Sequence, residues 1–246
     1  GIDTAVTIDQ SVTGTFTGAI SQFTGQVGSL IKAGNSTLTL NGTNTYTGST
    51  TITAGTLALG ASGSLASTVL DVEAGTFDAS AAAALPAFTS ISGDGTINVG
   101  TKTVTLAAGG TVAPGNSPGD LDITGGLDIA ALADTGGLLF ELGALSDGIN
   151  VTGDLALGTL NFADFTFTPG AGFGVGSYTL IDGDGSVSGG IGTASGIISY
   201  GGDDFIATLG IADGNNVVLD VVIPEPASLA LMGVAGLVLL PRRRSA

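Results

Sequence analysis

The chain has 246 residues, of which 43% are hydrophobic, and a formal net charge of -16. Three of its five basic residues lie at the C-terminal end, so residues 1–241 carry 21 acids against Lys32 and Lys102, a net charge of -19. So acidic a body repels nucleic acid, because affinity for phosphate depends on lysine and arginine, and we predict no nucleic-acid partner. The chain has no cysteine and no histidine, which excludes disulfides, thiolate chemistry and the usual ligands of zinc.

Glycine accounts for 43 residues, a content that alone would fit a disordered chain. The hydrophobic residues, however, alternate in short runs, which favours strands with a packed core. A motif of glycine, threonine and alternating apolar residues recurs, with its glycines at Gly55, Gly75, Gly95 and Gly110. Weaker copies occur at 124–127 and 135–138. A turn and strand repeated every ~20 residues is typical of a β-solenoid. We therefore expect an all-β chain with glycine at its corners and apolar residues in a continuous core.

The chain begins at Gly1 rather than at a methionine, which fits either a removed signal peptide or a fragment. Residues 1–29 are rich in threonine and glycine and are expected to form short strands and turns. The alanine-rich stretch Ala79–Leu85, which ends at Pro86, favours one or two helical turns between coils.

A longer ordered pattern occupies residues 30–60. It reads Leu30-Ile31-Lys32-Ala33-Gly34, then Thr37-Leu38-Thr39-Leu40, then Asn44-Thr45-Tyr46-Thr47-Gly48, and ends in Gly55-Thr56-Leu57. This order resembles the autotransporter-associated β-strand repeat, and the resemblance implies a right-handed parallel β-helix of the kind found in exported bacterial surface proteins. Tyr46 is expected to stack between coils, with a binding platform as the alternative.

The resemblance to autotransporter passengers extends over roughly residues 16–165. It rests on the turn Pro114-Gly115-Asn116-Ser117-Pro118-Gly119, followed by Leu139-Phe140-Glu141-Leu142 and by Asp147-Gly148-Ile149-Asn150-Val151-Thr152-Gly153. We assign residues 1–165 to the solenoid and residues 166–222 to its last coils and a cap. A cap is expected because an open solenoid end invites edge-to-edge association.

Residues 223–246 combine three features at the C-terminal end. Pro224-Glu225-Pro226 precedes an apolar run that extends from Ala227 to Leu240, and Arg242-Arg243-Arg244 follow. As a helix the run would be about 21 Å long at ~1.5 Å per residue, short for a membrane core of ~30 Å. The arginines favour a cytoplasmic C-terminus. The short run alone would equally allow a signal-like hydrophobic region, and an ordinary short membrane anchor is a further alternative.

The three features together resemble the PEP-CTERM sorting signal of bacteria. The resemblance implies that Pro224, Glu225 and Pro226 form the motif read by an exosortase, that a short transmembrane helix follows, and that Arg242, Arg243 and Arg244 form the membrane stop. It also implies an inner-membrane-anchored precursor with its C-terminus in the cytoplasm, and a mature body at the cell surface or outside the cell.

Catalytic patterns are weak. Gly115-Asn116-Ser117-Pro118-Gly119 matches the nucleophile elbow of hydrolases, but a chain without histidine cannot form the Ser-His-Asp triad. Pectate-lyase-like chemistry needs a basic residue beside calcium, and the body has only two lysines. Glycoside hydrolysis needs two carboxylates about 5–10 Å apart, for which Asp182 with Asp184, or Asp203 with Asp204, are nominal candidates. We predict no enzyme activity.

The same four aspartates, Asp182, Asp184, Asp203 and Asp204, are weak candidates for a calcium site, because hard cations prefer clustered carboxylates. Aspartate and glycine are also the residues that β-turns select, so a turn is the favoured reading and no cofactor is predicted.

The resulting hypothesis is a non-enzymatic, exported bacterial surface or extracellular-matrix protein, built as a stiff acidic rod. Family resemblance implies association with extracellular polysaccharide. The alternative is a glycan-binding or glycan-degrading β-helix, an adhesin or a polysaccharide-active enzyme.

Overall fold

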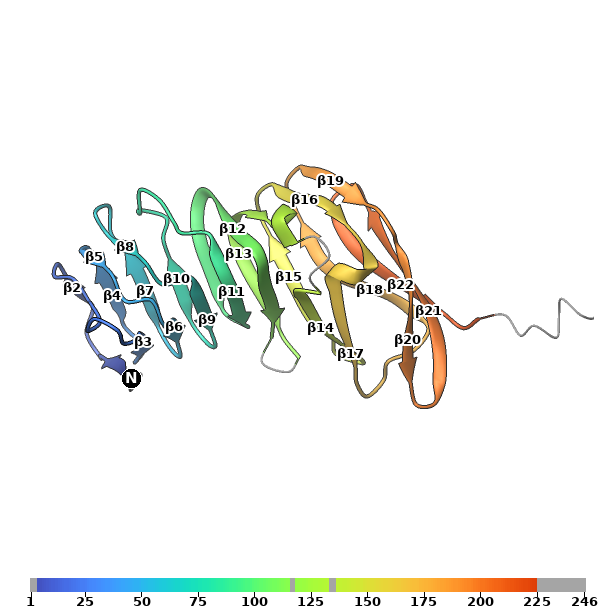
Figure 1. Ribbon diagram of the computed structural model, residues 1–246, viewed down its shortest axis with the longest axis horizontal. Helices are drawn as coiled ribbons and strands as arrows, with labels where there is room; N and C mark the ends of the chain where they lie inside the picture. Colours follow the sequence, from blue (N-terminus) through green and yellow to red (C-terminus); the bar gives the residue numbers. More distant parts are fainter. Residues whose placement is uncertain (1–3, 116–117, 133–135, 225–246) are drawn as a thin grey trace, which may run out of the picture.

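In the computed structural model, which describes residues 4–115, 118–132 and 136–224, the chain forms a β-solenoid of the right-handed type with about seven turns (Figure 1). Successive turns stack along the long axis of the molecule, and the two ends of the described chain lie at opposite ends of the stack. Each turn contributes a strand to each of two long parallel walls, and most turns add a third, shorter segment. The fold prediction of an all-β solenoid is confirmed for the described residues.

The first wall is a parallel ladder that runs the length of the solenoid. Its strands are β1 (Thr4–Asp9), β3 (Gly28–Ala33), β6 (Ser49–Ile52), β9 (Val69–Val72), β11 (Phe88–Gly93), the end of β12 (Thr96–Pro114), β14 (Leu138–Leu142) and β17 (Phe165–Pro169). One inward row of this wall joins residues 30, 50, 70, 91, 112, 138 and 165, so the coils are 20, 20, 21, 21, 26 and 27 residues long by subtraction.

The second wall is also parallel through most of its length. It contains β2 (Gly14–Phe16), β4 (Thr37–Leu40), β7 (Thr56–Leu59), β10 (Thr76–Asp78), the start of β12, β13 (Asp120–Asp128), β15 (Gly148–Val151) and β18 (Gly176–Gly183). The third side has β5 (Thr43–Asn44) paired with β8 (Ser64–Leu65), and later β16 (Leu155–Leu160) paired with β19 (Val187–Ile191). Two 3-10 turns, η1 (Ala130–Leu132) and η2 (Phe162–Asp164), join the third side to the first wall.

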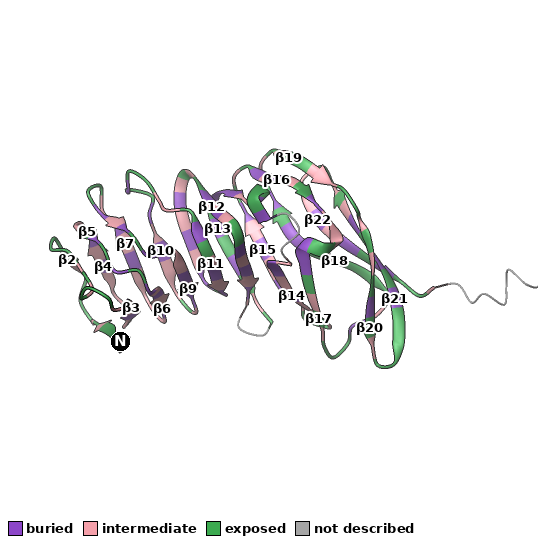
Figure 2. Ribbon diagram, in the orientation of Figure 1, coloured by how far each residue is buried: buried purple, intermediate pink, exposed green. Residues whose placement is uncertain are grey.

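The core follows from the alternation of residues along each strand. In β4, β6, β7 and β9 every second residue is buried, because successive side chains of a strand point to opposite faces (Figure 2). Stacking brings like residues together, as in the row Leu38, Leu57, Phe77, Ile97 and Ile123, each at most 4% exposed. The apolar interior is therefore one continuous column.

Gly55 and Gly75 form a stacked corner before the second wall, as predicted. A Cβ at Gly55, where φ is +66°, would lie 2.5 Å from the carbonyl oxygen of Gly34, and a Cβ at Gly75 would lie 2.5 Å from that of Gly55. The backbones of adjacent coils approach too closely there for any side chain.

The prediction that Gly110 repeats this corner is wrong. Gly110 precedes the part of β12 that pairs with β11 in the first wall, whereas Gly55, Gly75 and Gly95 precede strands of the second wall. The shorter step in the sequence reflects a different corner of the coil, because the coil that begins after Gly95 reaches the second wall again only at Asp122.

The predicted helical turns over Ala79–Leu85 are absent: this described segment holds a turn and irregular backbone. Ala79 and Ala82 are buried at 0% and 2% exposure. The stack therefore uses these small side chains to close the third side of a coil, and this overrides their helical propensity.

The C-terminal end of the stack is covered by antiparallel strands. These are β20 (Ser195–Tyr200), β21 (Asp203–Ala212) and β22 (Asn216–Val222), and β22 also pairs with β18. Their inner face buries Phe205, Leu209 and Leu219. Because antiparallel strands cannot continue the parallel ladder, this sheet ends the coil geometry.

Candidate functional site

The polar side chains of Asn44, Lys32 and Tyr46 lie in the interior, and Asn44 and Lys32 connect successive coils. Asn44 is 1% exposed. Its Oδ1 accepts a hydrogen bond from the backbone N–H of Ile20 at 3.0 Å, and its Nδ2 donates to the carbonyls of Gly42 and Ser64, each at 3.0 Å. The one amide thus joins its own coil to the coils on both sides, which satisfies every polar atom that its burial removes from water.

Lys32 occupies a core position, between Ile8 and Ile52 in the first wall, with no exposed surface. Its Nζ donates to the carbonyl oxygens of Ala33 at 2.8 Å, Gly34 at 2.7 Å and Ala54 at 3.2 Å. Burial lowers the pKa of the Lys32 ammonium, and the charge of Asp9 partly offsets that shift. The lysine therefore ties two adjacent corners together rather than presenting a base at the surface.

Tyr46 is 1% exposed and its hydroxyl lies 2.8 Å from Oγ1 of Thr50. Burial raises the pKa of the phenol to about 12, against a smaller lowering by the Thr50 hydrogen bond. The structure places the ring in the core, as the stacking interpretation predicts, and the alternative of a surface binding platform is wrong.

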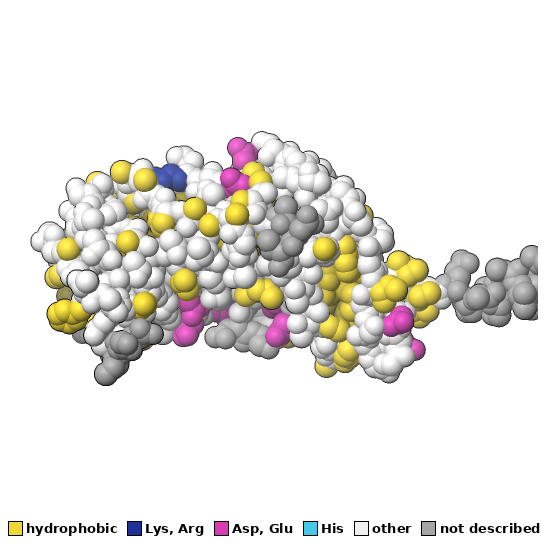
Figure 3. Space-filling model, viewed as in Figure 1, with side chains coloured by type: hydrophobic (Ala, Val, Ile, Leu, Met, Phe, Trp, Pro, Cys, Tyr) yellow, Lys and Arg dark blue, Asp and Glu magenta, His cyan; other side chains and the backbone are white. Residues whose placement is uncertain are grey.

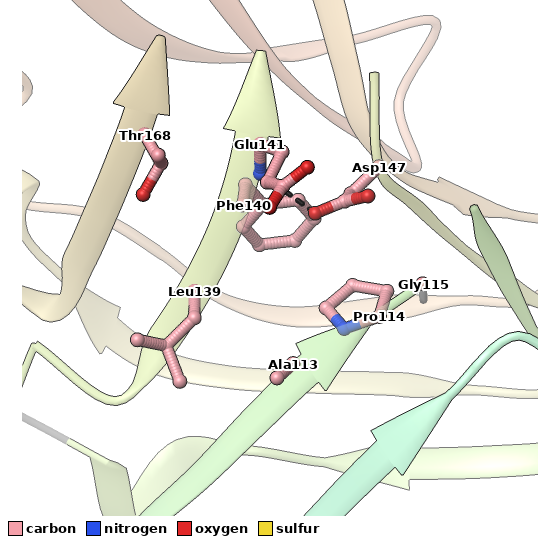
Figure 4. A pocket seen from close by; sticks show the side chains of 8 residues that line it. All are labelled: Ala113, Pro114, Gly115, Leu139, Phe140, Glu141, Asp147 and Thr168. Carbon is pink, nitrogen blue, oxygen red and sulfur yellow. Dashed lines mark hydrogen bonds between the residues drawn. The ribbon is translucent and has the colours of Figure 1, made fainter. Parts of the chain in front are cut away.

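A second cluster of interest forms where the three passenger-like motifs meet. Asp147, at the start of the third motif, is 3% exposed. Its Oδ1 accepts from the backbone N–H of Gly119 at 3.0 Å, and its Oδ2 accepts from that of Glu141 at 2.6 Å. Figure 4 shows the carboxylate turned toward the backbone of Glu141, beside Pro114 and Gly115. We call this arrangement the Asp147 junction.

The surroundings of Asp147 shift its carboxyl group toward the protonated form. Burial raises the pKa of Asp147, and the nearby charges of Glu141 and Asp120 raise it further, while the two backbone N–H donors lower it. Desolvation is the largest of these effects. The group has the pKa direction of a general acid, but its two oxygens are already engaged by backbone N–H groups. Geometry therefore favours a role in holding the turn to the next coil.

Three shallow cavities surround the junction. One of about 180 Å³ is lined by Pro114, Phe140 and Asp147 among others, and one of about 210 Å³ by Asp120, Asp147 and Asp182. A third, of about 280 Å³, lies beside Pro118 and Leu145. Each is smaller than the ~300–1,000 Å³ typical of small-molecule sites. The junction thus offers room for solvent and single side chains.

The nucleophile-elbow match joins two strands. Gly115 follows β12, and the residues after Gly119 form β13, where a hydrolase elbow would continue into a helix. Asn116 and Ser117 lie outside the described residues. The described part of the segment is therefore a strand-to-strand turn closed by Asp147.

The four candidate aspartates are all exposed, and they lie at two separate places. Asp182 follows Ile181, which pairs with Val217 of β22. Val217 pairs in turn with Ile211 of β21. Asp203 and Asp204 lie at the other end of β21, seven or eight residues from Ile211. At ~3.3 Å per residue this is a separation of about 25 Å. Asp204 accepts a hydrogen bond from Ser199 Oγ at 2.6 Å. Within the described ranges, no three acidic, histidine or cysteine side chains form a group suited to a metal.

Of the predicted sorting residues only Pro224 is described, half-buried directly after the last strand. Glu225, Pro226, the predicted transmembrane helix, and Arg242, Arg243 and Arg244 lie outside the described residues. Among the residues that the structure does describe, no helix is long and apolar enough to cross a membrane.

Comparison with known families identifies one repeat. Residues 30–59 match the model of the passenger-associated-transport-repeat. The match covers β3 to β7 and includes Lys32, Asn44 and Tyr46, the three interior polar residues described above. No curated protein matches the chain. The repeat and the solenoid fold both fit an exported, surface-displayed protein.

Proposed function

We propose that this chain is an exported bacterial surface or extracellular-matrix protein that acts as a stiff, non-enzymatic rod. The observation that carries the proposal is the passenger-associated repeat at residues 30–59, whose polar residues brace adjacent coils from within a continuous stack. Side chains fill the interior of the described coils, so a partner of this part of the chain would meet their outer surface. The acidic body keeps such rods apart through like-charge repulsion.

In this proposal the C-terminal segment decides where the rod is delivered. Pro224, Glu225 and Pro226 form the recognition motif of an exosortase-type protease, the apolar run from Ala227 to Leu240 is the membrane segment, and Arg242 to Arg244 hold the precursor's C-terminus in the cytoplasm. The support is the order of motif, apolar run and arginine cluster in the sequence. Extracellular polysaccharide is the proposed environment of the released body, and no metal or cofactor is required.

The test is fractionation of the bacterium that makes the protein, with mass spectrometry of the C-terminus of the recovered chain. We expect an extracellular product that ends near Pro224–Pro226. Replacing all three motif residues by alanine should leave the chain uncut in the inner membrane, while Leu145→Ala, an exposed change elsewhere, should be released normally. Release of the triple variant at the normal rate would contradict the sorting proposal.

The non-enzymatic part of the proposal has its own test. The purified body is incubated with a panel of acidic and neutral polysaccharides, and chain length and binding are measured. We expect no depolymerisation. Cleavage of any polymer that Asp182→Asn or Asp204→Asn abolishes would instead support the glycan-active alternative.

A further inference from the structure

The outer face of the C-terminal antiparallel sheet carries a row of exposed apolar residues. Ile197 lies opposite Ile206, and Ile206 lies opposite Val222, so the three form one line across β20, β21 and β22. They are 66%, 39% and 49% exposed, and the next residue, Ile223, is 66% exposed. We call Ile197, Ile206, Val222 and Ile223 the apolar row.

The apolar row opens at one end into a groove. Ile197 also lines a cavity of about 320 Å³ between β17 and β20, together with Phe162, Phe167 and Pro169. Figure 3 shows hydrophobic side chains gathered over β17 and β20 and again where the described chain ends. Exposed apolar surface gathered in this way marks a contact site.

The other end of the row is where the chain continues toward its own apolar segment. Residues 227–240 begin three positions after Pro224 and contain no charged residue. Neighbouring strands are about 4.8 Å apart, so the row is about 10 Å wide from Val222 to Ile197. Residues 223–226 can span about 13 Å when extended. Residue 227 can therefore reach any part of the row.

The charges beside the row favour this segment over other occupants. On the same face, Asp204 lies in the neighbouring row on one side, opposite Ser199, and Asp220 lies in the neighbouring row on the other side, opposite Thr208. Both are exposed. Two acidic rims repel a second copy of the same face and repel an anionic membrane surface, but they attract the arginines that follow the apolar segment.

We propose that residues 227–240 of this chain dock on the apolar row whenever they are not inserted in a membrane. The row then acts as an intramolecular cover for a segment that would otherwise expose apolar surface to water. Because the segment is joined to the row by only a few residues, its effective concentration there is high and docking needs little affinity per contact. This inference does not depend on recognition by a protease.

The test uses the full chain with Leu231→Trp, since the natural chain has no tryptophan and the new one reports only on the segment. In dilute solution we expect blue-shifted emission and several-fold weaker quenching by acrylamide than for free tryptophan. Adding Ile206→Glu should restore strong quenching. Val12→Glu, which changes an apolar residue 75% exposed near the opposite end of the solenoid, is the matched control and should leave the signal unchanged.

Each other outcome overturns the proposal. A fully quenched tryptophan means that the segment is not docked. Protection that rises with protein concentration identifies a second copy as the occupant, and protection that appears only with anionic vesicles identifies a membrane. Protection that survives Ile206→Glu places the segment elsewhere on the molecule. Circular dichroism of Ile206→Glu checks that the sheet stays folded, which is expected because the side chain points outward.

Discussion

The coils before residue 112 differ from those after it in length, charge and aromatic contacts. Along the first wall from residue 30 to residue 165, the coils before residue 112 are 20 or 21 residues long and those after it 26 or 27. Residues 4–112 contain five acids and two bases, whereas residues 113–224 contain fourteen acids and no base. In the part of the chain that the structure describes, every ring–ring contact joins residues from Phe140 onward.

This difference shows how a solenoid tolerates extra length. Stacked glycine corners occur in both kinds of coil, since a Cβ at Gly185 would clash with the carbonyl oxygen of Gly153. In the short coils of residues 30–59, interior polar groups also bond directly to the adjacent coils. A long coil places part of its additional length in a longer strand of the third side, where β16 pairs with β19. The rest lies in turns between the walls, which need a contact of their own to the adjacent strand. Asp147 provides such a contact, because it holds the turn that ends at Gly119 to the strand that contains Glu141.

The largest expected effect is in the core of the short coils. Phe77→Ala removes a side chain with no exposed surface from the middle of the second wall. We expect a loss of about 3–5 kcal/mol in the free energy of unfolding, because the rigid ladder cannot collapse into the cavity. Urea unfolding followed by circular dichroism measures it. Phe23→Ala, at a site 79% exposed, should change the free energy of unfolding by less than about 0.5 kcal/mol. Similar losses for both variants would contradict the apolar interior as the main source of stability.

The corner prediction compares two glycines with positive φ. Gly55→Ala adds a methyl group against the carbonyl of Gly34, while Gly109→Ala, at φ +73°, meets no atom within 4 Å. We expect Gly55→Ala to cost about 2–4 kcal/mol, from backbone strain plus the clash. Gly109→Ala should cost about 1 kcal/mol from backbone strain alone. Equal thermal and urea midpoints for the two variants would show that close coil approach is not what selects glycine.

Tyr46 should make the short coils sensitive to alkaline pH. Its pKa is about 12 in the folded chain against 10.0 as the ordinary value, so the unfolded chain loses the proton first. The stabilisation is fully present below pH 10 and is lost as the pH rises toward 12. Two pKa units correspond to about 2.7 kcal/mol. Tyr46→Phe should be the less stable protein at pH 8, because Thr50 loses its partner, and the more stable one near pH 12. Parallel curves for the two proteins would exclude this role.

The smallest expected effect is at Asp147, which holds a turn of a long coil to the strand that contains Glu141. Asp147→Ala leaves two buried N–H groups without an acceptor and should cost about 1–3 kcal/mol. Because burial raises the pKa of Asp147, its contribution to stability is greatest below the ordinary carboxyl pKa and falls as the pH rises through the raised value. The stability advantage of the parent over Asp147→Asn should therefore shrink as the pH rises above the ordinary carboxyl pKa.

Asp154 provides the opposite control in the same half of the molecule. Hydrogen bonds from Ser186 lower the pKa of the exposed Asp154 carboxyl, so its contribution is present above the ordinary carboxyl pKa and is lost as the pH falls. The advantage of the parent over Asp154→Asn should shrink on acidification. Urea midpoints at several pH values test both predicted pH dependences. A stability advantage of the parent over Asp147→Asn that grows with pH would mean that the backbone N–H donors outweigh burial in their effect on the pKa of Asp147.

The type of fold and its period follow from the amino-acid sequence alone. Alternation along Thr37-Leu38-Thr39-Leu40 requires one buried face, and glycines spaced by twenty residues mark the corner at Gly55, Gly75 and Gly95. Asp147 is the first residue of the third passenger-like motif, which is visible in the sequence as well. These signals are local, so they can be read without knowing which coils are neighbours.

The roles that depend on the register between coils became clear from the three-dimensional arrangement. The sequence could not tell that Gly110 belongs to another corner, that Lys32 and Asn44 lie in the interior with their partners on adjacent coils, or that Asp182 and Asp204 are far apart. Nor could it align Ile197, Ile206 and Val222 on one face. Each of these depends on hydrogen-bonded pairing between segments distant in the chain, which a change of one residue in register would alter for every side chain.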